Sequence, residues 1–152
     1  MLVKNILAEK SGELITASPG TSLDEGMKLL IEHGIACLLV TDDNEKLVGI
    51  VSDRDIFKKV YETKGEYHKL RLEDIMTSAL IVGLPTDKIA NIAWIMEKNY
   101  IRHIPIVEGD KLIGIVSERD IIKHQTDKIE IENRYLTTYM EDIHHRDMSG
   151  DQ

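Results

Sequence analysis

The octapeptide GIVSDRDI at Gly49–Ile56 occurs again as GIVSERDI at Gly114–Ile121, with seven of its eight residues identical. The surrounding sequence repeats as well, because Leu23–Asp42 aligns with Ile89–Glu108 without a gap. A unit half the size of this chain buries only about 60% of its surface and is marginally stable alone. The sequence therefore predicts two copies of one unit, packed with pseudo-twofold symmetry around a cleft.

Each copy shows the same order of elements, β-α-β-β-α. In the first helix, Leu23, Met27 and Leu30 recur at helical spacing, and Ser22 with Glu25 three residues later is a typical helix start. Polar turns separate the second and third strands, as in hairpins. The predicted strands are Leu14–Thr16, Ala36–Thr41 and Leu47–Val51 in the first copy and Leu80–Val82, Arg102–Val107 and Leu112–Val116 in the second; the second helices start at Ser52 and Ser117.

The repeat divides the chain into four parts. The first copy covers residues 1–62, a linker covers 63–71, and the second copy covers 72–125. Residues 126–152 are predicted to form a C-terminal helix and a polar tail. Tyr135, Leu136, Tyr139 and Met140 form an apolar stripe on this helix.

Composition excludes several classes of function. The formal net charge of −8 argues against nucleic acid or an anionic membrane as a partner, because both need a basic surface. The sequence has neither a run of about 18 apolar residues nor a signal peptide. The single cysteine, Cys37, lies in an apolar run and is expected to be a buried packing residue. These features predict a cytoplasmic protein.

No catalytic or metal-binding constellation stands out. The glycine-rich phosphate loops are absent, and no Cys–His or Ser–His pair has a supporting context. His144 and His145 lie near Asp142 and Asp147, but in a polar tail that offers no second shell to fix ligand geometry. We therefore expect neither an enzyme nor a metal site.

The two heptapeptides GIVSDRD at Gly49–Asp55 and GIVSERD at Gly114–Asp120, each placed at a strand end and helix start, resemble a tandem CBS-domain pair. This regulatory module is named after cystathionine β-synthase. The step Ile104-Pro105-Ile106 in a middle strand adds to the resemblance, which covers about Val3–His124. It implies an α+β fold of two CBS domains and a disc-like homodimer. In this family the module usually regulates an attached enzyme, channel or transporter. Because the repeats fill this sequence, we expect a stand-alone module that acts on an unidentified protein in trans.

By this resemblance, the cleft binds a regulatory adenine ligand such as AMP, ADP, ATP or S-adenosylmethionine, and no cofactor is required. Asp120 and Asp55 would hold the ribose hydroxyls, since an ionised carboxylate is a pure acceptor. Ser117 and Ser52 would meet the phosphate or ribose at a helix N-terminus, which favours anions. The remaining candidates are the basic Arg119, Arg54, Arg102 and His103, the base-flanking Ile104 and Pro105, and Thr16 and Val82 at the ends of the first strands.

Two alternatives stay open. A Ser-x-x-Asp motif at a helix start is also a capping box, which stabilises the helix without any ligand. The chain would then be a dimerisation scaffold with vestigial sites. If ligand binds, a phosphorylated adenosine is expected at the Asp120 site, because Tyr100–His103 contains Arg and His where Gly34–Cys37 contains neither.

Overall fold

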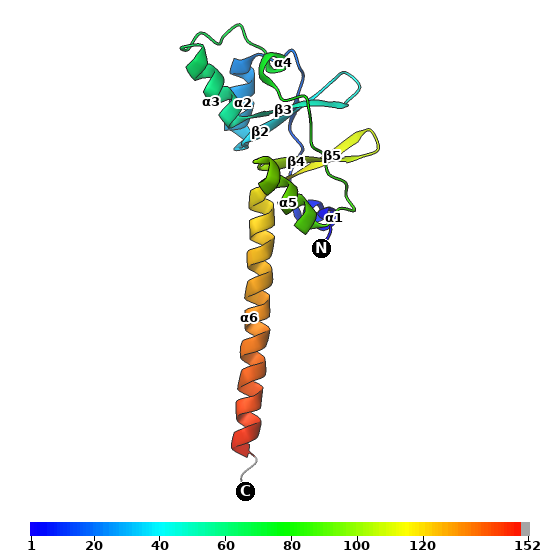
Figure 1. The fold of residues 1–152 in the computed structure, drawn as a ribbon, viewed down its shortest axis with the longest axis vertical. Helices are drawn as coiled ribbons and strands as arrows, with labels where there is room; N and C mark the ends of the chain where they lie inside the picture. The colour runs from blue at the N-terminus through cyan, green and yellow to red at the C-terminus, as the bar shows by residue number, and fades with distance from the viewer. Residues whose placement is uncertain (150–152) are drawn as a thin grey trace.

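The computed structural model describes residues 1–149, without the side chains of residues 141, 142 and 144–149. Two halves of similar plan lie one above the other, and a long helix projects from the lower half (Figure 1). The first half of the chain forms α1 (Val3–Glu9), β1 (Thr16–Ala17), α2 (Leu23–His33), β2 (Cys37–Thr41), β3 (Leu47–Ser52) and α3 (Asp53–Glu62). The second half forms α4 (Leu72–Ile75), α5 (Ile89–Asn99), β4 (His103–Glu108), β5 (Lys111–Ser117) and α6 (Glu118–Ser149).

The two sheets share one hairpin geometry. β2 pairs antiparallel with β3, and Cys37 lies opposite Ser52. β4 pairs antiparallel with β5, and His103 lies opposite Ser117. In both halves the serine that precedes the last helix therefore lies beside the start of the middle strand. The start of α2 is also as predicted, because Ser22 Oγ accepts a hydrogen bond from the Glu25 N–H at 3.2 Å.

The predicted strand Leu80–Val82 is wrong. The chain instead makes a single parallel bridge at Gly83, whose N–H donates to the Pro105 carbonyl and whose carbonyl accepts from the Val107 N–H. Its counterpart β1 is also shorter and later than the predicted Leu14–Thr16. Pairing stops in both places because a turn containing proline follows within a few residues, and proline has no N–H for a ladder.

The first helix of each half packs in the core of the other half. Val3 and Ile6 of α1 are buried with Ile92 of α5 and Ile104 of β4. Leu72 of α4 is fully buried in the first core, whose members are Ala17, Leu23, Leu30, Leu38, Val40, Val51 and Ile56. Figure 1 shows α1 beside α5 and α4 beside α2 and α3. The repeats in the sequence divide at residues 62 and 72, but the packed cores do not follow this division, because α1 belongs to the second core and α4 to the first.

The glycine that opens each repeated octapeptide permits this crossing. A Cβ atom on Gly114 would lie 2.7 Å from Leu7 Cδ2, and one on Gly49 would meet Met76. Leu7 and Met76 belong to the crossing segments. The backbone of each third strand therefore lies against a crossing segment at a distance that leaves no room for a side chain.

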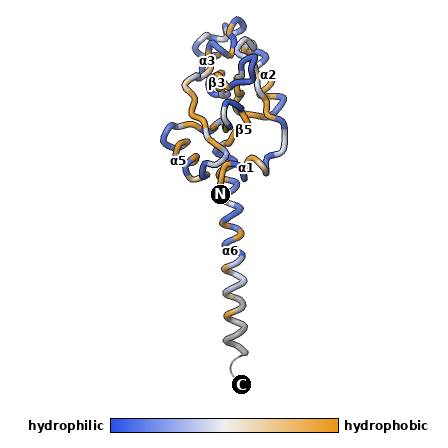
Figure 2. Tube along the Cα trace, turned by 90° about the vertical axis from the view of Figure 1, so that its right-hand side faces the viewer, coloured by the Kyte–Doolittle hydropathy of each residue, from blue (hydrophilic) through white to orange (hydrophobic). Residues whose placement is uncertain are grey.

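α6 is one continuous helix of 32 residues. The second helix of the second copy and the predicted C-terminal helix join without a break at residue 126. Beyond the body the helix projects alone, with apolar segments at intervals along it (Figure 2). Residues 150–152 of the predicted tail lie outside the described residues. Among the described residues, no helix combines the length and apolar composition that a membrane span requires.

The crossing predicts a large effect of one residue on stability. Leu72→Ala removes a fully buried side chain from the first core, so we expect the free energy of unfolding to fall by about 2–5 kcal/mol. Phe57→Ala is the control, because Phe57 is 79% exposed and such changes stay within about 0.5 kcal/mol. Urea unfolding of both variants measures the difference. Equal values for the two would contradict the contribution of α4 to the first core.

Candidate functional site

A cavity of about 530 Å³ lies between the two halves. Its wall comes from the segment after α1, from the end of α2 and β2, from the start of β4, and from β5 and the start of α6. Apolar side chains form much of this wall: Leu7, Leu14, Ile15, Ile35, Leu39, Ile113 and Ile115. Both copies of the repeat thus contribute to one site.

The polar part of the wall is more basic than the chain as a whole. Lys10, Arg102 and Arg119 line the cavity together with the acidic Glu13 and Glu118. The chain itself has a net charge of −8. A cavity with three cations and two carboxylates in such a chain favours an anionic group over a cationic one.

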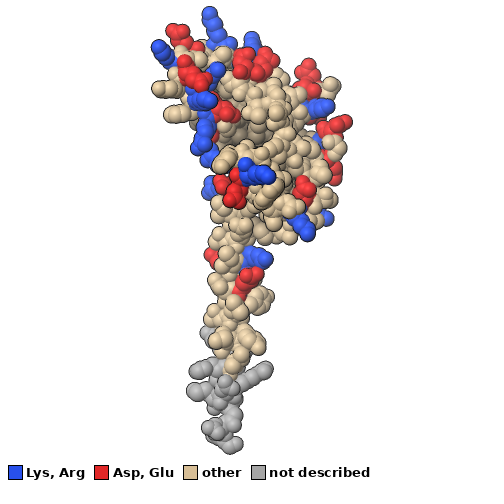
Figure 3. Space-filling model, viewed as in Figure 1, with Lys and Arg blue, Asp and Glu red and all other residues tan. Residues whose placement is uncertain are grey.

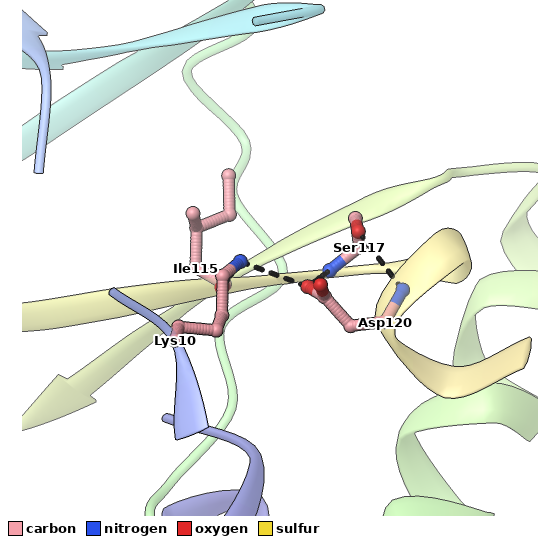
Figure 4. Close-up of polar contacts among 4 residues, drawn as sticks. All are labelled: Lys10, Ile115, Ser117 and Asp120. Atoms are coloured by element: carbon pink, nitrogen blue, oxygen red, sulfur yellow. Dashed lines mark hydrogen bonds and ion pairs between the residues drawn. The ribbon is translucent and has the colours of Figure 1, made fainter. Parts of the chain in front are cut away.

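Asp120 caps the start of α6 and also pairs with Lys10 (Figure 4). Its Oδ2 accepts hydrogen bonds from the Ser117 N–H at 2.8 Å and from Lys10 Nζ at 2.8 Å. Ser117 Oγ in turn accepts from the Asp120 N–H at 3.2 Å. Burial alone would raise the pKa of Asp120, but the hydrogen bonds from Lys10 and Ser117 outweigh it and lower that pKa. The carboxylate is therefore ionised at neutral pH.

Lys10 lies between Asp120 and the main cavity. Lys10 lines both this cavity and a smaller neighbour of about 50 Å³, whereas Asp120 lines only the smaller one. Lys10 Nζ also donates to the Ile115 carbonyl at 2.9 Å. Asp120 therefore does cap its helix, which was one of the two alternatives from the sequence, and a cavity also lies beside this cap.

The equivalent motif of the first copy is a complete capping box. Ser52 N–H donates to Asp55 Oδ2 at 2.8 Å, and Asp55 N–H donates to Ser52 Oγ at 3.0 Å. Neither Asp55 nor Ser52 lines either of the two cavities described here, and Arg54 does not line them either. The two copies therefore cap their helices alike but differ in what lies beside the cap.

A length difference accounts for this asymmetry. Seven positions separate Leu7 from Leu14, whereas four separate the aligned Met76 from Leu80. The shorter segment lies along β3, because Thr77 and Ile50 exchange two hydrogen bonds of 3.0 and 3.1 Å. The longer segment, residues 10–13, instead lines the cavity. The three additional residues thus leave space beside Ser117.

Four of the predicted site residues line the main cavity: Arg102, His103, Ser117 and Arg119. Ile104 and Pro105, which we expected to flank the base, are fully buried and do not line the cavity. Ile104 and Ile106 belong to the second core, and Pro105, whose side chain points to the opposite face of the strand, is fully buried as well.

Thr16 and Val82 are exposed and lie outside the wall of the cavity. β1 begins later than predicted, so the residues before it take the positions beside the site. On the first copy these are Leu14 and Ile15.

Two titratable side chains in the wall are neutral at neutral pH. Burial, followed by the positive charge of Arg102, lowers the pKa of His103 below its ordinary value. Burial, followed by the negative charge of Asp53, raises the pKa of the Cys37 thiol to about 12. His103 therefore offers a neutral imidazole rather than the positive charge we expected. Cys37 is buried, as predicted, and its thiol is protonated.

Sequence reasoning missed the segments Lys10–Glu13 and Gly34–Ala36, which also line the cavity. They carry no motif. The length difference between the aligned copies was the one available indication, because extra residues beside a predicted cleft have to be accommodated at its edge.

The candidate metal cluster of His144, His145, Asp142 and Asp147 lies outside the described side chains. Elsewhere in the described part of the chain, no group of three or more His, Cys, Asp or Glu side chains is placed to hold a metal ion.

Comparison with solved structures supports the same architecture. The CBS domain pair of protein MJ0100, solved in complex with 5′-methylthioadenosine and S-adenosyl-L-methionine, is 33% identical, with a TM-score of 0.74 over 84% of this chain and 98% of that one. CBSX2 in complex with AMP is 27% identical, with a TM-score of 0.70 over 83% of this chain and 96% of that one.

Curated relatives are longer than this chain. An L-aspartate semialdehyde sulfurtransferase of Methanocaldococcus jannaschii is 35% identical over 121 residues, which is 79% of this chain and 22% of that protein. The chain spans 34%, 22% and 60% of the length of the first three curated relatives it matches. The CBS domain profile matches residues 3–62 and 72–127, and this confirms the two repeats that the octapeptides indicated. The chain therefore belongs to the CBS domain family and is built as a CBS-domain pair.

Proposed function

We propose that this chain is a regulatory module that binds an adenine nucleotide in the cavity between its two CBS domains. The observation that carries the proposal is the 530 Å³ cavity, whose wall comes from both copies and lies beside Ser117 at the start of α6. Its volume is within the range of small-molecule sites. MJ0100 and CBSX2 bind adenosine-containing ligands in their own structures, which supports the same ligand class here.

The wall, together with the Asp120 carboxylate behind Lys10, offers a suitable group for each part of such a ligand. Apolar side chains, among them Ile35, Leu39 and Ile113, suit the faces of an adenine ring. The Asp120 carboxylate is an acceptor for ribose hydroxyls. The N-terminus of α6, with Arg119 and Arg102 nearby, suits a phosphate. We therefore favour AMP, ADP or ATP over S-adenosylmethionine, whose sulfonium is a cation.

The regulatory step in this proposal is a shift between packing arrangements. A ligand that touches both copies stabilises the arrangement in which both contact it. The surface of the module then differs between the bound and free states, and an unidentified partner protein acting in trans reads that difference. The proposal assigns no catalytic step to the chain.

A second candidate function is homodimerisation through α6. Ile122, Ile129, Leu136 and Ile143 recur every seven residues and are 55%, 56%, 62% and 41% exposed. These residues fill one of the two apolar positions of each heptad in a coiled coil, and Tyr139, three residues after Leu136, fills the second position in one heptad. Most of the stability of a helix in a protein comes from the packing of one face, and these four side chains are exposed. Figure 3 shows uncharged surface interrupted by a few charged side chains on the near face of the projecting helix, above the residues drawn in grey. The proposed partner is a second copy of this chain, because it carries the same repeat.

The first test of the nucleotide proposal uses the duplicated motif as its own control. Asp120→Asn and Asp55→Asn alter equivalent caps, since each carboxylate accepts its serine N–H at 2.8 Å. We expect Asp120→Asn to weaken AMP binding at least tenfold, because it removes charge-assisted hydrogen bonds to the ribose. Asp55→Asn should change it less than threefold. Isothermal titration measures both, and the reverse ranking would show that the ligand lies at the other copy.

Thermal unfolding separates a nucleotide-binding module from a scaffold with vestigial sites. At 100 times its Kd, a ligand that binds only the folded chain stabilises it by about 2.7 kcal/mol. For a chain of this size that raises Tm by about 5–10 °C. AMP, ADP, ATP and S-adenosylmethionine are compared at millimolar concentration. An unchanged Tm with all four ligands would favour the scaffold.

Light scattering tests the dimer. Leu136 belongs to the seven-residue repeat, whereas Ile131 is 50% exposed on the same helix but outside the repeat. We expect the wild type and Ile131→Glu to be dimers at micromolar concentration and Leu136→Glu to be monomeric, because the glutamate would place two like charges in the interface. A monomeric wild type, or dimers in all three proteins, would contradict pairing through this repeat.

A further inference from the structure

The Lys10–Asp120 ion pair engages one oxygen, Oδ2, of the carboxylate that a ribose would need. Asp120 Oδ2 already accepts from the Ser117 N–H and from Lys10 Nζ, both at 2.8 Å. The Lys10 and Asp120 side chains are 37% and 22% exposed. A nucleoside in the main cavity reaches Asp120 past the Lys10 ammonium group, because Lys10 lines that cavity and Asp120 does not.

The Lys10 ammonium group is held by few contacts and has a flexible stem. Its backbone is fixed at the end of α1, where the Lys10 N–H donates to the Ile6 and Leu7 carbonyls at 3.2 and 3.3 Å. The four-carbon side chain carries a point charge that can reorient. Nζ is held by the Asp120 carboxylate and the Ile115 carbonyl. Movement of Nζ therefore breaks two contacts and leaves the fold of α1 intact.

Released from Asp120, the ammonium group needs another anion in the cavity. Glu13 and Glu118 line the same wall but are exposed, and exposed ion pairs are weak. A phosphate carries up to two charges and makes short hydrogen bonds with an ammonium group. An uncharged nucleoside offers no such group. A phosphorylated nucleoside thus provides a new ion-pair partner for Lys10 after its contact with Asp120 is lost, and an uncharged nucleoside does not.

We propose that Lys10 makes this site selective for phosphorylated nucleosides by exchanging its anionic partner, from Asp120 in the free chain to the ligand phosphate in the complex. This inference rests on the proposed nucleotide function. Lys10 would act as a selectivity-determining residue at the site of the second motif. Counted from the aligned starts Val3 and Leu72, the residue equivalent to Lys10 is Ala79, so the first motif lacks this exchange.

The test compares AMP with adenosine on three full-length proteins. In Lys10→Met the charge is lost while the length of the side chain is kept. Lys123→Met is the matched control, because Lys123 lines only the smaller cavity and the variant has the same net charge. We expect Lys10→Met to lower the ratio of AMP affinity to adenosine affinity at least tenfold, since a hydrogen bond to a charged group is lost. Adenosine should bind as tightly as to the wild type or more tightly. Lys123→Met should change the ratio less than threefold.

The outcomes distinguish this inference from the function on which it rests. If the wild type binds neither AMP nor adenosine, the proposed function and the inference fail together. If the wild type binds AMP and Lys10→Met leaves the ratio unchanged, or weakens both ligands equally, the function stands and the exchange is overturned. Lys10→Gln keeps a donor for the Ile115 carbonyl and is measured in parallel. Thermal unfolding without ligand shows that each variant is folded.

Discussion

The burial of each leading helix in the opposite core is the interaction on which the rest of this structure depends. Val3 and Ile6 join the second core, and Leu72 joins the first. Neither half can close its core without a segment that the other half's sequence supplies. The two copies are therefore held together by the segment that each one supplies to the other. The cavity at their boundary is a consequence of that arrangement, because the chain leaves α1 directly beside β5.

Much of this fold was predictable from the repeat, but the exchange of helices was not. The hairpins and the helix starts at Ser22, Ser52 and Ser117 follow from local patterns of apolar and capping residues. Val3–Leu7 and Leu72–Met76 share one apolar pattern. Each would therefore fit either core, and periodicity cannot show which core each segment enters. The strand predicted at Leu80–Val82 is absent. Its apolar residues indicate burial, but strand pairing also depends on where the chain turns, which these residues do not show.

The candidate site was predictable where it carries a motif. Arg102, His103, Ser117 and Arg119 lie in the wall, in the copy that the sequence favoured. The family resemblance placed Ile104 and Pro105 beside the base. Both are fully buried outside the wall of the cavity, and three successive apolar residues in a middle strand do not indicate which side faces a cavity. Lys10 had no motif and no partner visible in the sequence. Its role depends on the pairing of residues 110 positions apart.

The segment after α1 has a consequence for how a duplicated protein can diverge. Residues 10–15 belong to neither a helix nor a strand, although they border the cavity. Loops of this kind tolerate insertion and substitution better than the elements they connect. Ligand preference in such a module can therefore evolve through the length and charge of one short connection, while both cores stay constant. A difference of three residues in one connection is enough to make the two halves of a duplicated unit unequal.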